Sequence, residues 1–559
     1  MKKKFYIITL LSTFFMNGQT GLFENKETFT RQDSLRGTIT PERSWWDLKH
    51  YHLAVQVFPE TKRIKGSNII SFEVLNAANI MQIDLQEPLN ITKVIHLREA
   101  DESGKPMQED LSFTREGNVY WITFPKALTL NSSQKIIIHY EGIPTESRNP
   151  PWSGGITWRK DLFGTEFIAS SNQGIGASIW WPNKDHYYDE PDLGVNIDIT
   201  VPEHLTDVSN GRLLRTSHNK EAKTKTYYWK VENPINNYGV NINIGDYVHF
   251  SETYQGEKGS LDCDYWVLSY NLKKAKKQFK QAAMTLEAFE HWFGPYPFYE
   301  DSFKLVEAPY LGMEHQSSVT YGNNYKNGYL GSDLSGTGVG LKFDFIIVHE
   351  VGHEWFANSI TNKDVADMWI HEGFTAYSEN LFVNYHFSKE EANTYVIGTR
   401  RSISNDKPLI GQYNVNNEGS GDMYYKGANI LHTIRQMVND DEKWRQILRG
   451  LNKDFYHQQV TTEQVENYII EKSGLNLEAF FDQYLRTIKI PEFTFKVKKK
   501  KLYYQFNNTV EGFGIPVKVY VNGKEMWLNA NTTEQEFLAS EKITSFEIDQ
   551  NFYLTSKKI

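Results

Sequence analysis

Two histidines in the middle of the chain have the spacing of a metal site. His349 and His353 are four residues apart, so a helix would place both imidazoles on one face, within reach of a single ion. Glu350 follows the first histidine, and its carboxylate would lie beside the ion, where it can take a proton from a water bound to zinc. The surrounding apolar residues recur at helical spacing without a proline, which predicts a helix here.

A third ligand is available in the next apolar-periodic segment. Glu372 follows His353 after 18 intervening residues, enough for the first helix to end, for a turn near 362–364, and for a second helix to pack alongside. Two imidazoles and one carboxylate leave the fourth zinc position open, which is typical of a catalytic rather than a structural site. We therefore predict one Zn²⁺ per chain, held by His349, His353 and Glu372. We expect Glu379, two turns further on, to be an exposed carboxylate; the alternative is that it orients a ligand histidine.

The elements that position these residues follow from the pattern of apolar residues. A chain of 559 residues exceeds a single core. Strand-like alternation, as at Leu53, Val55 and Val57, predicts an N-terminal β-sheet domain over 45–250. Helical periodicity begins near residue 272, and short strands return after Pro491. We expect a multidomain α+β fold, with a mostly helical catalytic domain over 251–490 and a C-terminal β-sandwich-like module over 491–559.

The first residues predict export. Three lysines at 2–4 precede an apolar run of twelve residues, the proportions of a signal peptide, here placed at 1–18 and followed by a flexible leader over 19–44. We expect a periplasmic or secreted protein with no integral membrane segment in its mature form, because no later apolar run reaches 18 residues. A net charge of −9 disfavours nucleic acid as a partner.

Several motifs, in a consistent order, resemble one family. The segments HEVGHEWFANSIT and WIHEGFTAYSE, which hold the three expected ligands, look like the gluzincin zinc aminopeptidases, the family of aminopeptidase N and leukotriene hydrolase. Residues 310–315, Tyr-Leu-Gly-Met-Glu-His, are similar to its Gly-x-Met-Glu-Asn motif, and 424–428 match its Tyr-x-Lys-Gly motif. Residues 171–173, 180–185 and 189–191 are similar to the β-domain segment that borders the active site. The resemblance implies that the catalytic domain is thermolysin-like.

The resemblance also implies roles for individual residues. Tyr424 would stabilise the tetrahedral intermediate through its phenol. Glu314, assisted by the side-chain carbonyl of Gln173, would bind the free α-ammonium group of a peptide. Gly312 would let the backbone approach the substrate, and Met313 would line the first side-chain pocket. The implied function is hydrolysis of the N-terminal peptide bond of peptides that have a free N-terminus, with Glu350 as general base.

The sequence departs from the family pattern at two kinds of position. His315 and His371 stand where the family commonly has asparagine, and either imidazole is expected to change specificity or the pH optimum if it titrates near neutrality. Only 68 residues follow Pro491, whereas many members of the family have a large helical domain there. We therefore expect a short form without that domain, and a more open cleft as a consequence.

Alternative functions remain at this stage. A thermolysin-like endopeptidase would use the same zinc site, but the motif around Glu314 argues against it. A catalytically inactive scaffold would be expected to have lost zinc ligands, whereas all three are present together with Glu350 and Tyr424. Epoxide hydrolysis of the leukotriene type is chemically conceivable, but no residue in the sequence favours it.

Overall fold

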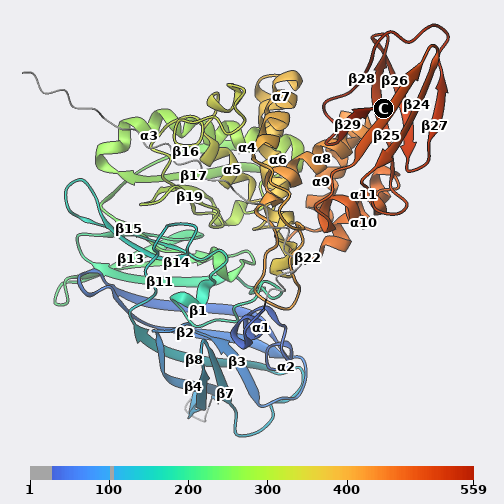
Figure 1. Cartoon of the computed structure of the whole chain (residues 1–559). Coiled ribbons are helices and arrows are strands. Elements are labelled where there is room, and N and C mark those ends of the chain that lie inside the picture. Colours follow the sequence, from blue (N-terminus) through green and yellow to red (C-terminus); the bar gives the residue numbers. More distant parts are fainter. Residues whose placement is uncertain (1–27, 101–105) are drawn as a thin grey trace, which may run out of the picture.

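The computed structural model describes residues 28–100 and 106–559. In Figure 1 an N-terminal β-rich region (blue to teal) lies below a region of mixed strands and helices (green to orange), and a β module (red) packs at the C-terminal end. This is the expected multidomain α+β arrangement. The signal peptide expected at 1–18 lies outside the described residues. Among the described helices, none is long and apolar enough to cross a bilayer.

The expectation of a flexible leader over 19–44 is wrong for its second half. Residues Arg31–Gly37 form helix α1 and Pro41–Ser44 form helix α2. Thr30 caps α1 by accepting a hydrogen bond from the backbone of Asp33. Arg43 is fully buried and forms an ion pair of 2.7 Å with Asp84. The polar composition of this segment suggested a leader, but the β domain provides buried partners for its charges.

The N-terminal region is built on an eight-stranded sheet with the order β13-β14-β11-β1-β2-β8-β4-β5. Its central strand β1 pairs antiparallel with β2 and parallel with β11. Leu53, Val55 and Val57 of β1 are buried, which confirms the alternation read from the sequence. The strands are β1 (Trp46–Phe58), β2 (Arg63–Val74), β4 (Asn90–Ala100), β5 (Pro106–Asp110), β8 (Ser133–Gly142), β11 (Val195–Pro202), β13 (Arg212–Asn219) and β14 (Thr224–Val231).

Two smaller sheets complete this region. One has the order β3-β7-β6 and the other β12-β15-β10-β9. Strand β10 ends at Ser171, so the loop that follows carries Gln173 towards the rest of the molecule. The strands are β3 (Ile80–Asp84), β6 (Ser112–Glu116), β7 (Val119–Thr123), β9 (Gly155–Lys160), β10 (Glu166–Ser171), β12 (Thr206–Val208) and β15 (Asn243–Gly245).

The middle region joins a five-stranded sheet to a set of helices. The sheet has the order β16-β17-β18-β20-β19, which leaves β19 at an edge. Its strands are β16 (Tyr247–Gly256), β17 (Gly259–Leu268), β18 (Phe303–Glu307), β19 (Gly312–Met313) and β20 (Val319–Tyr321). The helices are α3 (Leu272–Gln278), α4 (Lys280–Phe293), α5 (Phe345–Gly352), α6 (Trp369–His386), α7 (Lys389–Thr399), α8 (Tyr425–Val438), α9 (Asp441–Asp454), α10 (Thr462–Ser473) and α11 (Glu478–Arg486). Helices α4, α5, α6 and α8 supply much of one continuous apolar core.

The C-terminal module consists of two sheets, with the orders β27-β24-β23-β29 and β26-β25-β28. Buried residues of both sheets belong to the same core as the helices of the middle region, so the module is packed onto that region. Its strands are β23 (Glu492–Lys498), β24 (Lys501–Asn507), β25 (Gly514–Val521), β26 (Lys524–Asn531), β27 (Gln535–Leu538), β28 (Phe546–Ile548) and β29 (Thr555–Lys558). Strands β21 (Ile360–Asn362) and β22 (Gln458–Val460) form a separate parallel pair.

Candidate metal centre and active site

Helix α5 presents the two histidines. Asp344 begins the helix, because its carboxylate accepts hydrogen bonds from the backbone N–H groups of Ile346 and Ile347. His349 lies in the last turn of α5, and His353 immediately follows Gly352 with helical backbone angles. Both imidazoles are buried, and their ring centroids are 4.9 Å apart. The spacing of four residues therefore brings the two rings together as the sequence predicts.

Helix α6 brings Glu372 to the same point. The residue lies in the first turn of α6, where the positive end of the helix dipole favours a carboxylate. Its Oε2 atom is 3.3 Å from Nε2 of His353 and 3.6 Å from Nε2 of His349. Ligand atoms of the three residues all lie within 4.8 Å of one another. The structure thus brings together the three residues that the sequence predicts as ligands.

The donor set fits zinc. Bonds of about 2.0–2.1 Å in a tetrahedral site separate neighbouring donor atoms by roughly 3.3 Å, close to the two distances from Glu372. Oε2 of Glu372 is buried and has no hydrogen-bond partner among the described residues. A buried carboxylate oxygen without a donor is costly unless a cation compensates it. One Zn²⁺ held by His349, His353 and Glu372 supplies that cation.

The outer nitrogens of both histidines are held in place. Nδ1 of His349 lies 2.8 Å from Oε1 of Glu379, and the second oxygen of Glu379 accepts a 2.5 Å hydrogen bond from Tyr395. Nδ1 of His353 lies 3.0 Å from the carbonyl oxygen of Phe356. Such contacts leave Nε2 of each ring for the metal. The expectation that Glu379 is exposed is wrong: α6 packs directly on α5, so the residue is fully buried.

The charges of the ligands are coupled. Burial raises the pKa of Glu372, but the imidazoles of His353 and His349 more than offset this and hold it below its usual range. Burial lowers the pKa of His349, but Glu372 and Glu379 more than offset this and hold it well above its usual value. The carboxylates around these rings therefore favour positive charge at this point, whether it is carried by protons or by a metal ion.

Glu350 is poised to exchange a proton. Burial raises its pKa to about 7, although the imidazoles of His349 and His353 oppose the increase. A carboxyl group with a pKa near neutrality can both accept and release a proton at physiological pH. Glu350 also belongs to a second buried cluster, in which its carboxylate, that of Glu314 and the ring of His353 lie within 4.8 Å of one another.

The remaining predicted site residues line one small cavity with the metal ligands. Its volume is about 90 Å³, and Gln173, Gly312, Met313, Glu314 and Tyr424 all contribute to its wall. The structure therefore brings together every residue assigned to the site from the sequence. Reasoning from the sequence missed Pro151 and Trp152, which also line the cavity. They lie in a loop between β8 and β9, and no feature of their local sequence indicates a role.

Polar contacts from the β domain reach the carboxylates of the cavity. Nε2 of Gln173 donates a hydrogen bond of 2.9 Å to Oε1 of Glu372. The hydroxyl of Tyr238 donates one of 3.2 Å to Oε1 of Glu314, and the amide of Asn358 donates one of 2.8 Å to the backbone carbonyl of Glu314. The contact of Gln173 is with a metal ligand, so its side-chain carbonyl is the group left to face a substrate. Tyr238 and Asn358 have no motif in the sequence that predicts these contacts.

Tyr424 faces the metal centre from the start of α8. Its ring stacks on that of His349, with centroids 5.9 Å apart. Burial, together with the nearby charges of Glu372 and Glu314, raises the pKa of the phenol well above its usual value. The phenol therefore keeps its proton and can donate a hydrogen bond into the cavity.

The two histidines that depart from the family pattern do not titrate near neutrality, contrary to the expectation from the sequence. Burial lowers the pKa of both His315 and His371 to about 3. Nε2 of His371 accepts a hydrogen bond of 2.8 Å from the backbone of Asn362, as a neutral imidazole does. Neither ring can therefore set the pH optimum in the neutral range.

The fold and the site together define a zinc metallopeptidase. The sequence profile of the peptidase family M1 domain matches residues 277–484, and that of the M1 N-terminal domain matches 48–238. The chain belongs to peptidase family M1.

Individual relatives are distant. Leukotriene A-4 hydrolase of Xenopus laevis is 22% identical over 460 residues, which cover 77% of this chain and 68% of the relative. Puromycin-sensitive aminopeptidase of Caenorhabditis elegans is 20% identical over 459 residues, 79% of this chain but 47% of the relative. The chain thus spans about two thirds of the first relative and about half of the second.

A solved structure has the same fold. An M1 zinc metallopeptidase from Deinococcus radiodurans, in a glutamate-to-alanine variant bound to a Tyr-Ser-Ala substrate, superimposes with a TM-score of 0.64 at 18% identity. The match covers 80% of this chain and 95% of that one. This similarity supports the arrangement of the N-terminal sheet and the helical region.

Proposed function

We propose that this protein is an aminopeptidase, which hydrolyses the N-terminal peptide bond of peptides that have a free α-ammonium group. The observation that carries the proposal is the position of Glu314, a buried carboxylate in the same small cavity as Glu350 and the metal ligands. The cavity has a volume of about 90 Å³, so Glu314 lies close to the metal ligands and to Glu350 in a small space. The names of the relatives, which include an aminopeptidase, agree with this reading.

A free ammonium group would complete the charges of the cavity. Burial raises the pKa of Glu314, and the nearby carboxylate of Glu372 raises it further, although His353 opposes them. A buried carboxylate is stabilised when a cation pairs with it. The ammonium group of a substrate supplies this cation, with Tyr238 fixing one oxygen of Glu314 and the carbonyl of Gln173 as a further acceptor.

The rest of the peptide would follow the edge of the sheet. Strand β19 (Gly312–Met313) pairs only with β20, so its outer edge is available for pairing with a substrate strand. A side chain at position 312 would not fit, because its Cβ would lie 2.6 Å from Ile346 and 2.9 Å from Oε1 of Glu350. Gly312 therefore allows α5, which carries the general base Glu350, to pack closely against the strand.

A second cavity lies where the downstream residues of such a peptide would emerge. It measures about 580 Å³, and Tyr310, Leu311 and Trp152 contribute to its wall. Trp152 lines both this cavity and the one at the metal, and its side chain is 62% exposed. A peptide with its ammonium group at Glu314 would pass Gly312 and then reach Leu311. The remainder of a longer substrate thus has an apolar surface to contact.

The chemistry assigns a task to each group of the chain. When bound, zinc lowers the pKa of water and polarises a carbonyl oxygen. Glu350 accepts the proton of the attacking water and later releases it to the leaving amine, for which a pKa of about 7 is suitable. Tyr424 donates a hydrogen bond to the oxyanion of the tetrahedral intermediate. Glu314 holds the ammonium group, so that the first peptide bond lies beside Glu350.

The test compares an aminoacyl fluorogenic substrate with its N-acetylated twin. The free amine should be hydrolysed at least a hundredfold faster in kcat/KM, and a chelator should abolish the reaction. In Glu314→Gln, which removes the charge and keeps the shape, this preference should fall by tenfold or more. Equal turnover of both substrates by the unmodified protein would rule out an aminopeptidase, and cleavage of internal bonds in blocked peptides would indicate an endopeptidase instead.

We also propose that the protein is exported, on the basis of the lysines and the apolar run at 1–18. The full-length gene product should be recovered outside the cytoplasm with its N-terminus near residue 19. N-terminal sequencing of the fractionated protein checks this. An intact N-terminus on protein that stays in the cytoplasm would contradict it.

A further inference from the structure

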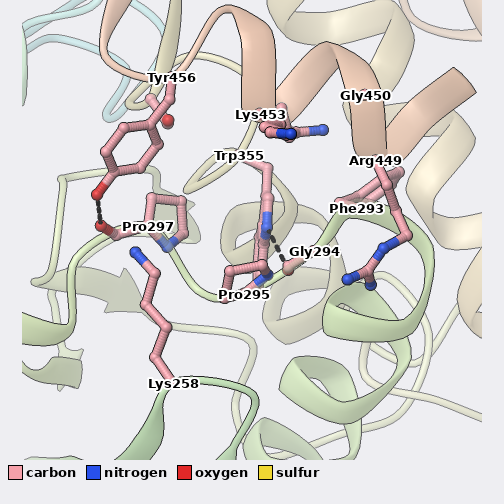
Figure 2. A pocket seen from close by; sticks show the side chains of 12 residues that line it. Lys258, Phe293, Gly294, Pro295, Pro297, Trp355, Arg449, Gly450, Lys453 and Tyr456 are labelled. Atoms are coloured by element: carbon pink, nitrogen blue, oxygen red, sulfur yellow. Dashed lines mark hydrogen bonds between the residues drawn. The ribbon is translucent and has the colours of Figure 1, made fainter. Parts of the chain in front are cut away.

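A third cavity, in the middle region, shares no lining residue with the metal site. It has a volume of about 440 Å³ and lies between the end of α4, the segment after α5, and α9 (Figure 2). Its apolar wall comprises Phe293, Pro295, Pro297, Trp355 and Tyr456. Hydrogen bonds fix two of these rings: the indole of Trp355 donates to the carbonyl of Gly294 at 3.1 Å, and the hydroxyl of Tyr456 donates to that of Pro297 at 2.7 Å.

Cationic side chains surround this apolar wall. Figure 2 shows Lys258, Arg449 and Lys453 around the central Trp355. Arg449 is neutralised by two hydrogen bonds of 2.8 and 2.7 Å to the carboxylate of Glu257. In the part of the chain that the structure describes, neither Lys258 nor Lys453 forms an ion pair with a carboxylate. The opening of the cavity therefore carries two uncompensated positive charges, which favour an anionic ligand.

Two buried polar atoms of the lining have no partner. Oγ of Ser359 and Oδ1 of Asn452 are both inaccessible to solvent and form no hydrogen bond with any described residue. The other end of the Asn452 amide is occupied, because Nδ2 donates to the carbonyl of Leu448 one turn earlier in α9. Buried polar atoms are normally satisfied, and an unpaired amide oxygen calls for an N–H or O–H donor. Because neither atom is accessible to a water molecule, a donor gains access to them only when the lining of the cavity shifts.

We propose that this cavity is a second ligand site, which binds a small apolar carboxylate that carries a hydrogen-bond donor. The carboxylate would lie at Lys258 and Lys453, and the apolar body would lie against Trp355. A shift of the lining on binding would expose Oδ1 of Asn452 to an N–H group of the ligand. A cavity of this size suits a molecule such as an N-acylated amino acid. An amide N–H group suits the site better than a free ammonium group, because Lys258 and Lys453 repel a positive charge on the ligand.

The segment 355–359 links this site to the metal centre. Its residues Trp355 and Ser359 line the cavity. Between them, the carbonyl of Phe356 contacts Nδ1 of His353 at 3.0 Å, and the amide of Asn358 donates to the backbone carbonyl of Glu314 at 2.8 Å. A shift of residues 355–359 would therefore move groups that contact the zinc ligand His353 and the backbone of Glu314, the residue assigned to the substrate ammonium group.

Backbone strain is located at the centre of the same segment. Ala357, between Phe356 and Asn358, has a φ of 144°, a value that residues with a side chain rarely adopt. Strained residues of this kind persist only where the surrounding structure holds them, and they can change conformation when a ligand alters those contacts. We therefore expect a ligand in this cavity to change kcat or KM at the metal site. This effect rests on the proposed aminopeptidase activity.

The binding test uses N-acetyl-L-phenylalanine and its neutral counterpart, N-acetyl-L-phenylalaninamide, titrated into the zinc-loaded full chain by calorimetry. The acid should bind at least tenfold more tightly than the amide. Binding of the acid should weaken at least tenfold in the double variant Lys258→Ala/Lys453→Ala and disappear in Asn452→Leu, which fills the cavity and removes the acceptor. Lys472→Ala, an exposed lysine of α10 that does not line the cavity, should bind within twofold of the unmodified protein.

Two results would overturn the assignment: equal binding of acid and amide, or binding to the double variant within twofold of the unmodified protein. Circular dichroism checks that each variant is folded, and Ser359→Ala, which should weaken binding at least threefold, replaces Asn452→Leu if the latter does not fold.

The coupling is measured separately. Saturating N-acetyl-L-phenylalanine should change kcat or KM for an aminoacyl substrate at least threefold in the unmodified protein but not in Asn452→Leu. Binding without any kinetic effect would overturn the coupling and leave the site intact. If the protein hydrolyses no aminoacyl substrate, the proposed function fails while calorimetry still decides whether the site exists.

Discussion

Removal of the charge from Glu379 tests how the metal centre is supported. Oε1 of Glu379 is 2.8 Å from Nδ1 of His349, and the residue is fully buried. The substitution Glu379→Gln keeps a carbonyl oxygen at this distance and removes the negative charge. Mutation of a residue that supports a metal-ligating histidine typically weakens metal binding ten- to a hundredfold. This corresponds to about 1.4–2.7 kcal/mol of binding free energy at 25 °C.

The apo protein provides the control for folding. Glu379 raises the pKa of His349, so in the metal-free parent the carboxylate pairs with a protonated imidazole, and the metal-free variant should unfold at a lower temperature than the metal-free parent. The zinc-loaded variant should lose part of the increase in unfolding temperature that zinc produces in the parent. Tyr395→Phe is the matched substitution, because it removes the partner of the second oxygen of Glu379 and leaves the contact with His349 in place.

The assay is competition for zinc with a chromogenic chelator, followed by thermal unfolding with and without the metal. We expect the dissociation constant for zinc to rise at least tenfold in Glu379→Gln and by less than this in Tyr395→Phe. If Glu379→Gln binds zinc within twofold of the parent while both unfold alike, the contact with His349 does not support the metal centre.

Three further predictions concern the reaction and the helix that bears the histidines. Glu350→Gln should retain stoichiometric zinc by metal analysis but reduce kcat by two to four decades, on the order of what general-base catalysis contributes; a near-normal rate would exclude this role. Tyr424→Phe should lower kcat by roughly two to three decades, or about 2.7–4 kcal/mol, with little change in KM, and a pure increase in KM would argue against oxyanion binding. Burial raises the pKa of Asp344 to about 6, from 3.8 for an unperturbed carboxyl group, so the folded protein favours the protonated form. The stability that this protonation contributes is fully present below pH 3.8 and is lost as the pH rises through 6. Urea unfolding between pH 4 and 7 should show this loss, on the order of 3 kcal/mol, in the parent but not in Asp344→Asn, and identical pH profiles of the two proteins would contradict it.

The sequence by itself determined the metal ligands. The spacing of His349 and His353 places them on one face of any helix, because the geometry of a helix is the same in every fold. The interval to Glu372 left room for a second helix to return, and the motifs around Glu314 and Tyr424 resembled those of a family with a known arrangement. Alternation of apolar residues likewise predicted the strands of the N-terminal sheet, since a strand with one buried face requires it.

The tertiary structure decided what surrounds these residues. Glu379 looked like an exposed helix carboxylate, and only the packing of α6 on α5 placed it against His349. The pKa values of His315 and His371 depend on burial, which no local pattern reveals. Local patterns specify which way a side chain points along its own element, whereas burial and charge partners depend on elements distant in the sequence. The cavity lined by Trp355 and Asn452 therefore exists only because α4, the segment after α5 and α9 pack together.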